Sequence, residues 1–420
     1  MLSKRILKVL FMPCVLASCH SNNEQKKETM QQSVNYEKGS FGYDLNFLKS
    51  RDEQLAILKS DDSAAMVIIS PKYQGKVFTS TANGLNARSF GWVNYKAFDT
   101  TNAHMNGYGS EDRLWLGPEG GKYSLFFNPG AKMEFENWHT PASIDNEAWT
   151  LVASGNNAVS LKKETSMQNY AGTNLKITIE RSIDLLKNKD IEQELGVAID
   201  SSIKSVGFST ANTLVNSGTN DWTQETGAPC TWNLGMFPPS ANTVIIIPYI
   251  DHANGKVATT DYFGEIPNDR IVYKNGVLLF KADGKSRGKL GITPAHVKNV
   301  AGSYAADDNV LTIIKFDIDN KAAYLNQEWR TDRPSYSGDA MNAYNDGPLA
   351  DGSQMGPFYE LESVSPPAFL KHGEKMTHHH TVFHFTGNKS ALDGIAKKVL
   401  GISLQDISLP NTSEGGVKGK

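Results

Sequence analysis

Residues 175–185 read LKITIERSIDL, and this stretch decides the fold class of the chain. Leucine and isoleucine alternate with polar residues along most of it, which is the period of a strand with one buried face. Similar short runs, rich in β-branched or aromatic residues, recur between Gly, Asn, Asp and Pro. They cover residues 64–70, 76–80, 123–127, 149–154, 191–197, 243–249, 276–281 and 310–317. Turn pairs such as Asn275-Gly276 and Asp283-Gly284 stand between strands of this kind.

Helices are few in this pattern. The spacing of Leu48, Leu55 and Leu58 predicts one short helix within residues 45–59. No βαβ alternation and no internal repeat at a fixed period is visible. We therefore expect an all-β fold, a large antiparallel β-sandwich with few short helices. Because no Pro- or Ser-rich linker interrupts residues 41–400, we expect a single domain there.

The N-terminus has the three zones of a secretory signal peptide in their usual order. The basic residues come first, at Lys4, Arg5 and Lys8. An apolar run follows at residues 9–16, too short to span roughly 30 Å of bilayer hydrocarbon. Residues 16–19, LASC, resemble the lipobox of bacterial lipoproteins, in which the Cys thiol receives a lipid. We expect residues 1–18 to be removed and Cys19 to be acylated, as by palmitate; the alternative is a plain signal peptide with an incidental Cys.

The sequence also predicts where the protein resides. Residues 19–40 are polar and nearly free of aliphatic side chains, so they cannot bury enough surface to fold and are expected to form a flexible tether. Residues 401–420 are expected to be a flexible tail. His20 follows the expected lipid anchor, where Asp is commonly associated with inner-membrane retention. We therefore expect the protein to be lipid-anchored in the cell envelope, at the outer membrane, either on its periplasmic face or at the cell surface.

Cysteine usage and charge exclude two classes of protein. Once Cys14 has left with the signal peptide and Cys19 is acylated, Cys230 is the last cysteine, which excludes a disulfide scaffold. The formal net charge is −3, and no Lys/Arg-rich patch of the kind that neutralises phosphates is present. We therefore expect no nucleic-acid partner.

The first segment with candidate binding residues is 106–121, NGYGSEDRLWLGPEGG. Two acids and an arginine stand among aromatic residues and glycines. Such a set suits a pocket in which an aromatic ring stacks on a sugar and charged groups bind its hydroxyls. The candidate substrate-binding residues here are Glu111, Asp112, Arg113 and Trp115. The alternative is a glycine-rich loop whose Arg113 pairs with a neighbouring acid for shape only.

The second segment is 335–366, SYSGDAMNAYNDGPLADGSQMGPFYELESVSP. Its loop contributes the candidate substrate-binding residues Asp339, Asn342, Tyr344, Asn345 and Asp346. In the strand that follows, Glu360 and Glu362 share one face with Phe358 and Val364. On a buried face the two carboxyls need partners, and their mutual repulsion raises a pKa, which makes an acid or base. On an exposed face they would be ordinary surface charges.

The third segment is 377–385, THHHTVFHF. On a strand, His378, His380 and His384 fall on one face and His379 on the other. Histidine can supply a proton or a metal ligand, but no third metal ligand is identifiable and no helical His-Glu-x-x-His signature is present. We therefore expect no metal and no other cofactor. A polar edge strand with scattered imidazoles is the alternative.

Three runs carry a resemblance to known proteins. They are GYGSEDRLWLGPEGG (107–121), GDAMNAYNDGP with GPFYELESVSP (338–348 and 356–366) and HTVFHFTG (380–387). Together they resemble a family of bacterial envelope lipoproteins whose domain is similar to the galactose mutarotase (aldose 1-epimerase) β-supersandwich, over about residues 60 to 387. The resemblance implies a Glu that takes a proton from the sugar and a His that donates one. Glu360 or Glu362 matches the late-strand base, whereas the His is matched only by position, by His104, His139 or His296. The mutarotase run Gly-Arg-x-x-Asn-Arg has no counterpart here.

The resemblance and the residues leave three functions open. The first is an isomerase of the aldose 1-epimerase type, with Glu362 or Glu360 as base and a histidine such as His104 as acid. The second is a lipid-tethered protein that binds a glycan without catalysing a reaction. The third is a carbohydrate-active hydrolase or lyase on the same fold. In each, the partner is a carbohydrate, and the membrane is reached through the lipid on Cys19.

Overall fold

The structure is a computed structural model that describes residues 35–409. The expected signal peptide, the acylated Cys19, most of the tether and the last part of the expected tail lie outside the described residues. The described part belongs to one compact unit of the chain, Tyr36–Lys420.

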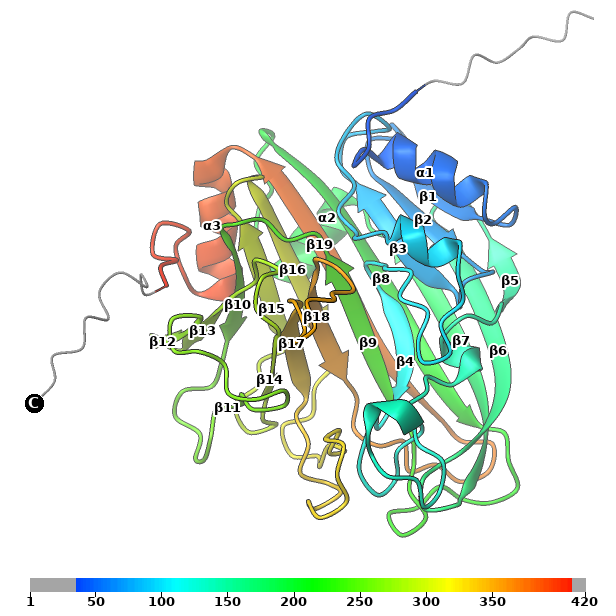
Figure 1. The fold of residues 1–420 in the computed structure, drawn as a ribbon. Coiled ribbons are helices and arrows are strands. Elements are labelled where there is room, and N and C mark those ends of the chain that lie inside the picture. The colour runs from blue at the N-terminus through cyan, green and yellow to red at the C-terminus, as the bar shows by residue number, and fades with distance from the viewer. Residues whose placement is uncertain (1–34, 410–420) are drawn as a thin grey trace, which may run out of the picture. The chain divides into compact units, whose positions relative to one another are not determined.

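Two large antiparallel sheets form the body of this unit (Figure 1). The larger has ten strands in the order β12-β13-β10-β15-β16-β19-β8-β7-β6-β5. Its strands are β5 (Thr150–Ser154), β6 (Ala158–Gln168), β7 (Asn174–Leu185), β8 (Ile203–Asn216), β10 (Thr243–Pro248), β12 (Ile271–Lys274), β13 (Val277–Lys281), β15 (Val300–Ala305), β16 (Val310–Phe316) and β19 (Lys375–Gly387).

The second large sheet has six strands in the order β11-β14-β17-β18-β9-β4. They are β4 (Arg113–Gly117), β9 (Cys230–Phe237), β11 (Ala258–Thr259), β14 (Gly288–Ile292), β17 (Met341–Asn345) and β18 (Tyr359–Val364). A small third sheet consists of β1 (Ala56–Lys59), β2 (Met66–Ser70) and β3 (Lys76–Thr81). The helices are α1 (Phe41–Lys49), α2 (Asn188–Leu195) and α3 (Lys389–Leu400), with 3-10 turns at Tyr95–Phe98, Phe135–Asn137 and Ala142–Ile144.

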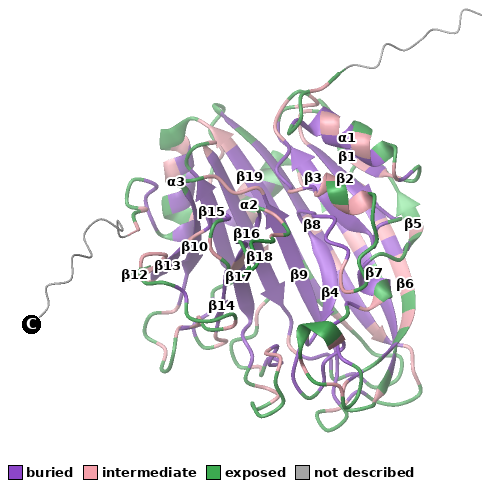
Figure 2. Ribbon diagram, viewed as in Figure 1, coloured by how far each residue is buried: buried purple, intermediate pink, exposed green. Residues whose placement is uncertain are grey.

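The main core lies between the two large sheets, whose central strands are buried along most of their length (Figure 2). Polar contacts also cross this interior: the Tyr359 hydroxyl of β18 lies 2.7 Å from Ser303 Oγ of β15. A second core, with Ile191 of α2 and Leu392 of α3, covers the opposite face of the ten-stranded sheet. Helix α1 packs its Phe41 against the three-stranded sheet. None of the described helices is long and apolar enough to span a membrane.

The all-β, antiparallel class expected from the sequence is confirmed, and most of the expected strands are present. The helix expected within residues 45–59 was placed wrongly. Helix α1 ends at Lys49, Asp52 Oδ1 then accepts the Gln54 backbone N–H in a turn, and β1 pairs with β2. Because the Asp52 side chain accepts this N–H, the chain turns here and continues as an extended segment instead of a helix.

Two expected strands are not strands. Residues 191–197 belong largely to α2, because Ile191 and Leu195 are four residues apart and both are buried on one helical face. Residues 123–127 form a buried loop closed by turn hydrogen bonds, such as Leu125 N–H to the Pro118 carbonyl. At the C-terminal end, Ile402 and Leu404 are buried in the second core, so the chain stays packed for a few residues beyond α3.

Candidate functional site

The two faces of the six-stranded sheet differ in chemistry. The face toward the ten-stranded sheet carries apolar residues such as Leu361, Ala343 and Leu290. The opposite face carries charged and aromatic side chains, because residues paired across neighbouring strands point to the same side. We call these residues the polar face: Arg113, Trp115, Trp232, Lys289, Tyr344, Glu360 and Glu362.

Arg113 and Glu360 form a buried ion pair on this face. Arg113 Nη2 donates to Glu360 Oε1 at 2.9 Å, and the two side chains are only 6% and 8% exposed. The guanidinium carbon of Arg113 also lies 4.2 Å from the ring centroid of Trp115, in cation–π contact. Burial raises the pKa of the Glu360 carboxyl, while Arg113 lowers it and Glu362 raises it. A raised pKa brings Glu360 closer to exchanging a proton near neutral pH.

Glu362 lies two residues along the same strand and has its own partners. Its Oε2 accepts the indole N–H of Trp232 at 2.8 Å and lies 3.4 Å from Lys289 Nζ. The Lys289 ammonium is 4.6 Å from the ring centroid of Trp232, so a cation, an aromatic ring and a carboxylate lie together. The Glu362 side chain is fully buried. The expected pair of carboxyls on one buried face is therefore present, and each carboxyl has a different cation.

Several buried polar atoms of this region have no hydrogen-bond partner within residues 35–409. They are Arg113 Nε, Trp115 Nε1, Gln327 Nε2 and Glu362 Oε1. Gln327 belongs to the same region, because a Cβ added to Gly117 of β4 would lie 3.1 Å from Gln327 Oε1. Unpartnered buried polar groups are rare in folded proteins and call for an explanation. Here the set combines three N–H donors with one carboxylate acceptor.

Tyr262, Tyr344 and the loop acids form the rim of the polar face. Tyr262 donates its hydroxyl to Asp339 Oδ2 at 2.7 Å, and Tyr344 donates to Asp346 Oδ1 at 3.0 Å. Both tyrosines are partly exposed. Burial raises the pKa of Asp339 to about 6, an effect that the Tyr262 hydrogen bond opposes. The amide of Asn342 reaches the same Tyr262 hydroxyl at 3.5 Å.

Three expected substrate-binding residues lie away from the polar face. Asp112 precedes Arg113 and points the other way, into the core, where it pairs with Arg181 at 3.1 Å. Glu111 is fully buried, and its carboxylate accepts from the backbone N–H and hydroxyl of Ser80. Asn345 holds a turn by accepting the Gly284 backbone N–H. These three side chains are occupied by structural contacts.

The histidines expected as proton donors lie elsewhere. His104 Nδ1 lies 2.7 Å from the Trp138 carbonyl, and its ring stacks on Phe135 and His139. His296 Nδ1 lies 2.7 Å from the Ile250 carbonyl. Among the described residues, no imidazole hydrogen-bonds to either carboxyl of the polar face.

The histidines of residues 377–385 belong to β19, and His378, His380 and His384 are buried in the interior of the sandwich. His378 Nε2 and His380 Nδ1 both contact the Ser363 hydroxyl, at 3.0 and 2.9 Å, and His384 Nδ1 contacts Thr312 at 2.9 Å. Burial lowers the pKa of His378 to about 3, so its ring is neutral at physiological pH. No group of three or more His, Cys, Asp or Glu side chains in the described part of the chain is arranged to hold a metal.

Sequence reasoning missed Lys289, Trp232 and Gln327. Lys289 stands in the short run GKLGI, where a lysine between apolar residues of a strand could have been noticed. Trp232 sits in a strand that is buried throughout, and nothing local distinguishes it from a core residue. Gln327 belongs to a loop over Gly117, which no pattern in the sequence predicts.

The described part of the chain is thus an antiparallel two-sheet protein with a charged and aromatic face on its smaller sheet. The chain belongs to the family described as a family of unknown function (DUF6786), which it matches over residues 39–410. No curated protein matches it.

Solved structures similar to this one include three bacterial proteins. A candidate aldose 1-epimerase from Escherichia coli K12 has a TM-score of 0.47 and 11% identity, covering 79% of this chain and 98% of that one. The Slr1438 protein from Synechocystis sp. PCC 6803 has a TM-score of 0.46 and 12% identity, covering 80% and 96%. A galactose mutarotase-like protein from Lactobacillus casei ATCC 334 has a TM-score of 0.46 and 10% identity, covering 79% and 99%.

Proposed function

We propose that this protein binds a carbohydrate at the polar face of its six-stranded sheet. The observation that supports this most is the set of buried, unpartnered polar atoms: Arg113 Nε, Trp115 Nε1 and Gln327 Nε2 as donors, and Glu362 Oε1 as acceptor. A hydroxyl group both donates and accepts, so a ligand with several hydroxyls can satisfy donors and an acceptor placed side by side.

The aromatic side chains of the same face support this ligand class. Trp115 and Trp232 lie 5.5 Å apart between ring centroids and adjoin the two cations of the face. Sugar binding calls for apolar ring surface against the C–H face of the ligand, together with polar groups that fix its orientation. The partly exposed Tyr262 and Tyr344 form the rim through which a ligand reaches this face.

The test is Arg113→Lys, measured by calorimetric titration of the full-length chain with a panel of aldohexoses. Lysine keeps the charge but loses the planar fork and the Nε donor. We expect at least a tenfold loss of affinity, with a smaller effect on the free energy of unfolding. Arg330→Lys is the matched control, because Arg330 forms an exposed ion pair with Asp332. Absence of sugar binding by the parent protein, or equal affinities of parent and Arg113→Lys, would overturn the proposal.

A second proposed function is isomerase chemistry of the aldose 1-epimerase type. The observation in its favour is that the two carboxyls of β18 have different surroundings: Glu362 has a free Oε1, and burial raises the pKa of Glu360. Two carboxyls with such different partners suit one proton acceptor and one proton donor. Glu362→Gln keeps the shape and removes the acceptor. It is therefore expected to abolish anomer interconversion, followed by NMR, and to spare affinity, whereas His104→Ala leaves the rate unchanged.

We also propose that the mature protein is anchored in the envelope by a lipid on Cys19, with the outer membrane as its site. The support is the order of basic, apolar and LASC zones at residues 4–19, and His20 in the place of Asp. Cys19→Ser is expected to abolish acylation and to move the protein out of the membrane fraction. Continued incorporation of labelled palmitate by this variant would contradict the proposal.

A further inference from the structure

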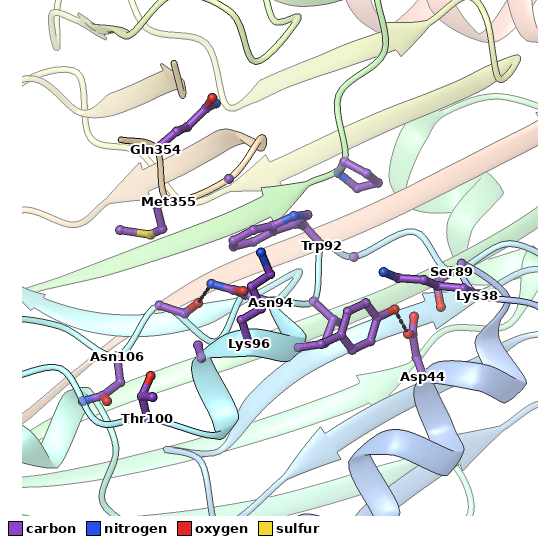
Figure 3. A pocket seen from close by; sticks show the side chains of 18 of the residues that line it. Lys38, Asp44, Ser89, Trp92, Asn94, Lys96, Thr100, Asn106, Gln354 and Met355 are labelled. Atoms are coloured by element: carbon purple, nitrogen blue, oxygen red, sulfur yellow. Dashed lines mark hydrogen bonds between the residues drawn. The ribbon is translucent and has the colours of Figure 1, made fainter. Parts of the chain in front are cut away.

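A large cavity lies beside the polar face (Figure 3). Its volume is about 1220 Å³, and its walls come from residues 37–44, 86–97, 100–107 and 349–356. Met105 lines the cavity, and its Sδ lies 3.7 Å from Arg113 Nη1. Trp92, another lining residue, packs against Phe358 next to β18, with ring centroids 4.8 Å apart and the rings tilted by 31°. The cavity therefore continues from the edge of the polar face.

The size of the cavity indicates what it can hold. Pockets for drug-sized ligands have volumes of about 300–1,000 Å³. At about 1220 Å³ this cavity exceeds that range. A single hexose would leave most of it to solvent, whereas a chain of several sugar residues would contact its walls. An oligosaccharide that enters the cavity could place one residue at the polar face.

The cavity wall has the groups that sugars bind. Trp92 stands near the centre of the view in Figure 3 and is partly exposed. Amide side chains surround it: Asn94, which donates to the Gly107 carbonyl at 2.9 Å, and Gln354, which donates to the Gly284 carbonyl at 2.9 Å. Each of these amides is fixed through its NH₂ group, which leaves its carbonyl oxygen for a ligand hydroxyl.

Two lysines of the lining present their ammonium groups to the cavity. Figure 3 shows Lys96 extending toward Trp92, whereas Lys38 lies over the ring of Tyr95, with its Nζ 5.0 Å from the ring centroid. Within residues 35–409, neither ammonium forms an ion pair. The third cation of the lining, Arg88, is neutralised by Asp308 at 2.6 Å.

The acids of the lining are Glu37 and Asp44, and Asp44 is occupied by the hydroxyl of Tyr95. The lining thus has three cations and two acids, in a chain whose formal net charge is −3. Because Arg88 is paired with Asp308, the remaining charges of the lining, two lysines and two acids, cancel. Lys38 and Lys96 still lack an ion pair among residues 35–409, so a carboxylate on a ligand in the cavity can pair with their ammonium groups.

We propose that this cavity is an extended subsite for an acidic oligosaccharide, a chain of sugars that carry carboxylates. The inference rests on the proposed sugar site at the polar face and names the class of ligand for it. Trp92 provides the stacking platform, Asn94 and Gln354 accept hydroxyls, and Lys38 and Lys96 bind the carboxylates. The sugar unit of the oligosaccharide that lies beside Met105 contacts Arg113.

The test compares two probes with the same sugar chain, one with charged and one with neutralised carboxyl groups: tetragalacturonate and its full methyl ester. Calorimetry with the full-length parent is expected to give at least fivefold tighter binding of the acid at 20 mM NaCl. The preference is expected to shrink at 500 mM NaCl, because salt screens exposed charges. The double variant Lys38→Gln/Lys96→Gln is expected to bind the acid about tenfold more weakly and the ester less than twofold more weakly, as fits the loss of two exposed charge contacts.

The control is Lys371→Gln/Lys375→Gln, which removes the same charge from exposed positions outside the cavity. Equal affinities of the two probes for the parent, or equal losses in both double variants, would overturn the acidic subsite while leaving sugar binding at the polar face intact. If neither probe binds the parent, the acidic subsite is wrong, and the aldohexose titration then decides the proposed function separately. Trp92→Ala is expected to weaken both tetrasaccharides but not an aldohexose.

Discussion

Replacing Arg113 with methionine tests the electrostatics of the polar face most directly. Arg113 and Glu360 are 6% and 8% exposed and 2.9 Å apart, so neither charge has solvent to replace its partner. Removing one partner of a buried ion pair costs about 3–5 kcal/mol, because the other charge is left uncompensated. Methionine retains the volume of the aliphatic stem, so the cavity contribution is small. At pH 8 we expect Arg113→Met to lower the free energy of unfolding by this full amount, about 3–5 kcal/mol.

The loss should depend on pH, with a sign that follows from the pKa of Glu360. Burial raises this pKa above its usual value, and Arg113 holds it down. Without Arg113 the folded-state pKa rises further, so the folded protein binds more protons than the unfolded chain. Stability is then lost as pH rises through the folded-state pKa, by about 1.4 kcal/mol per unit of difference between the two pKa values. At about pH 3, where Glu360 is protonated in both states, the loss should nearly vanish.

Urea unfolding of the parent, Arg113→Met, Glu360→Gln and the double variant at pH 5, 6.5 and 8 measures these terms. The double variant has no buried charge left to compensate, so it should recover most of the loss seen in Arg113→Met at pH 8. A loss of the same size at pH 5 and pH 8, or energies that simply add in the double variant, would refute the reasoning.

Three further predictions concern buried groups and a close approach of the backbone. Burial lowers the pKa of Lys76 from 10.5 to about 7, so the folded protein binds fewer protons than the unfolded chain. The free energy of unfolding, measured by urea titration, should therefore be about 2 kcal/mol larger at pH 9 than at pH 7, and Lys76→Met should remove this difference. Burial lowers the pKa of His378 from 6.5 to about 3, so between pH 7 and pH 5 the unfolded chain takes up a proton that the folded protein does not. The free energy of unfolding should therefore fall by about 2 kcal/mol from pH 7 to pH 5, and His378→Gln should remove this fall. A Cβ on Gly120 would lie 2.1 Å from the Glu328 carbonyl, so Gly120→Ala should cost about 1–3 kcal/mol and weaken sugar binding, by displacing the loop that carries Gln327. Gly394→Ala in α3, where nothing lies within 4 Å, is its control and should leave both quantities unchanged or slightly improved.

The sequence is sufficient for the fold class, because period-two alternation over many short runs has one physical solution, a sheet with a buried face. It also identifies Arg113, Glu360 and Glu362, since charged residues in strands need partners. The error at Asp112 was avoidable: neighbouring residues at the start of a strand point to opposite faces, so Asp112 and Arg113 cannot share a pocket. Local sequence patterns could not predict that Lys289 lies beside Glu362 on the polar face. This depends on β14 lying beside β17 and β17 beside β18, an order set by contacts between distant segments.

Two buried carboxylates on opposite sides of the six-stranded sheet, Asp112 and Glu362, differ in how completely their oxygens are paired. Both oxygens of Asp112 have partners in the core: Oδ1 accepts from Asn233, and Oδ2 accepts from Thr210 and pairs with Arg181. Glu362, on the opposite face, has partners for Oε2 only. A carboxylate held only for stability is expected to have both oxygens satisfied, because each unpaired one costs about 1–3 kcal/mol or more. The incomplete set at Glu362, beside Trp232 and Lys289, is what a ligand with hydroxyl groups would complete.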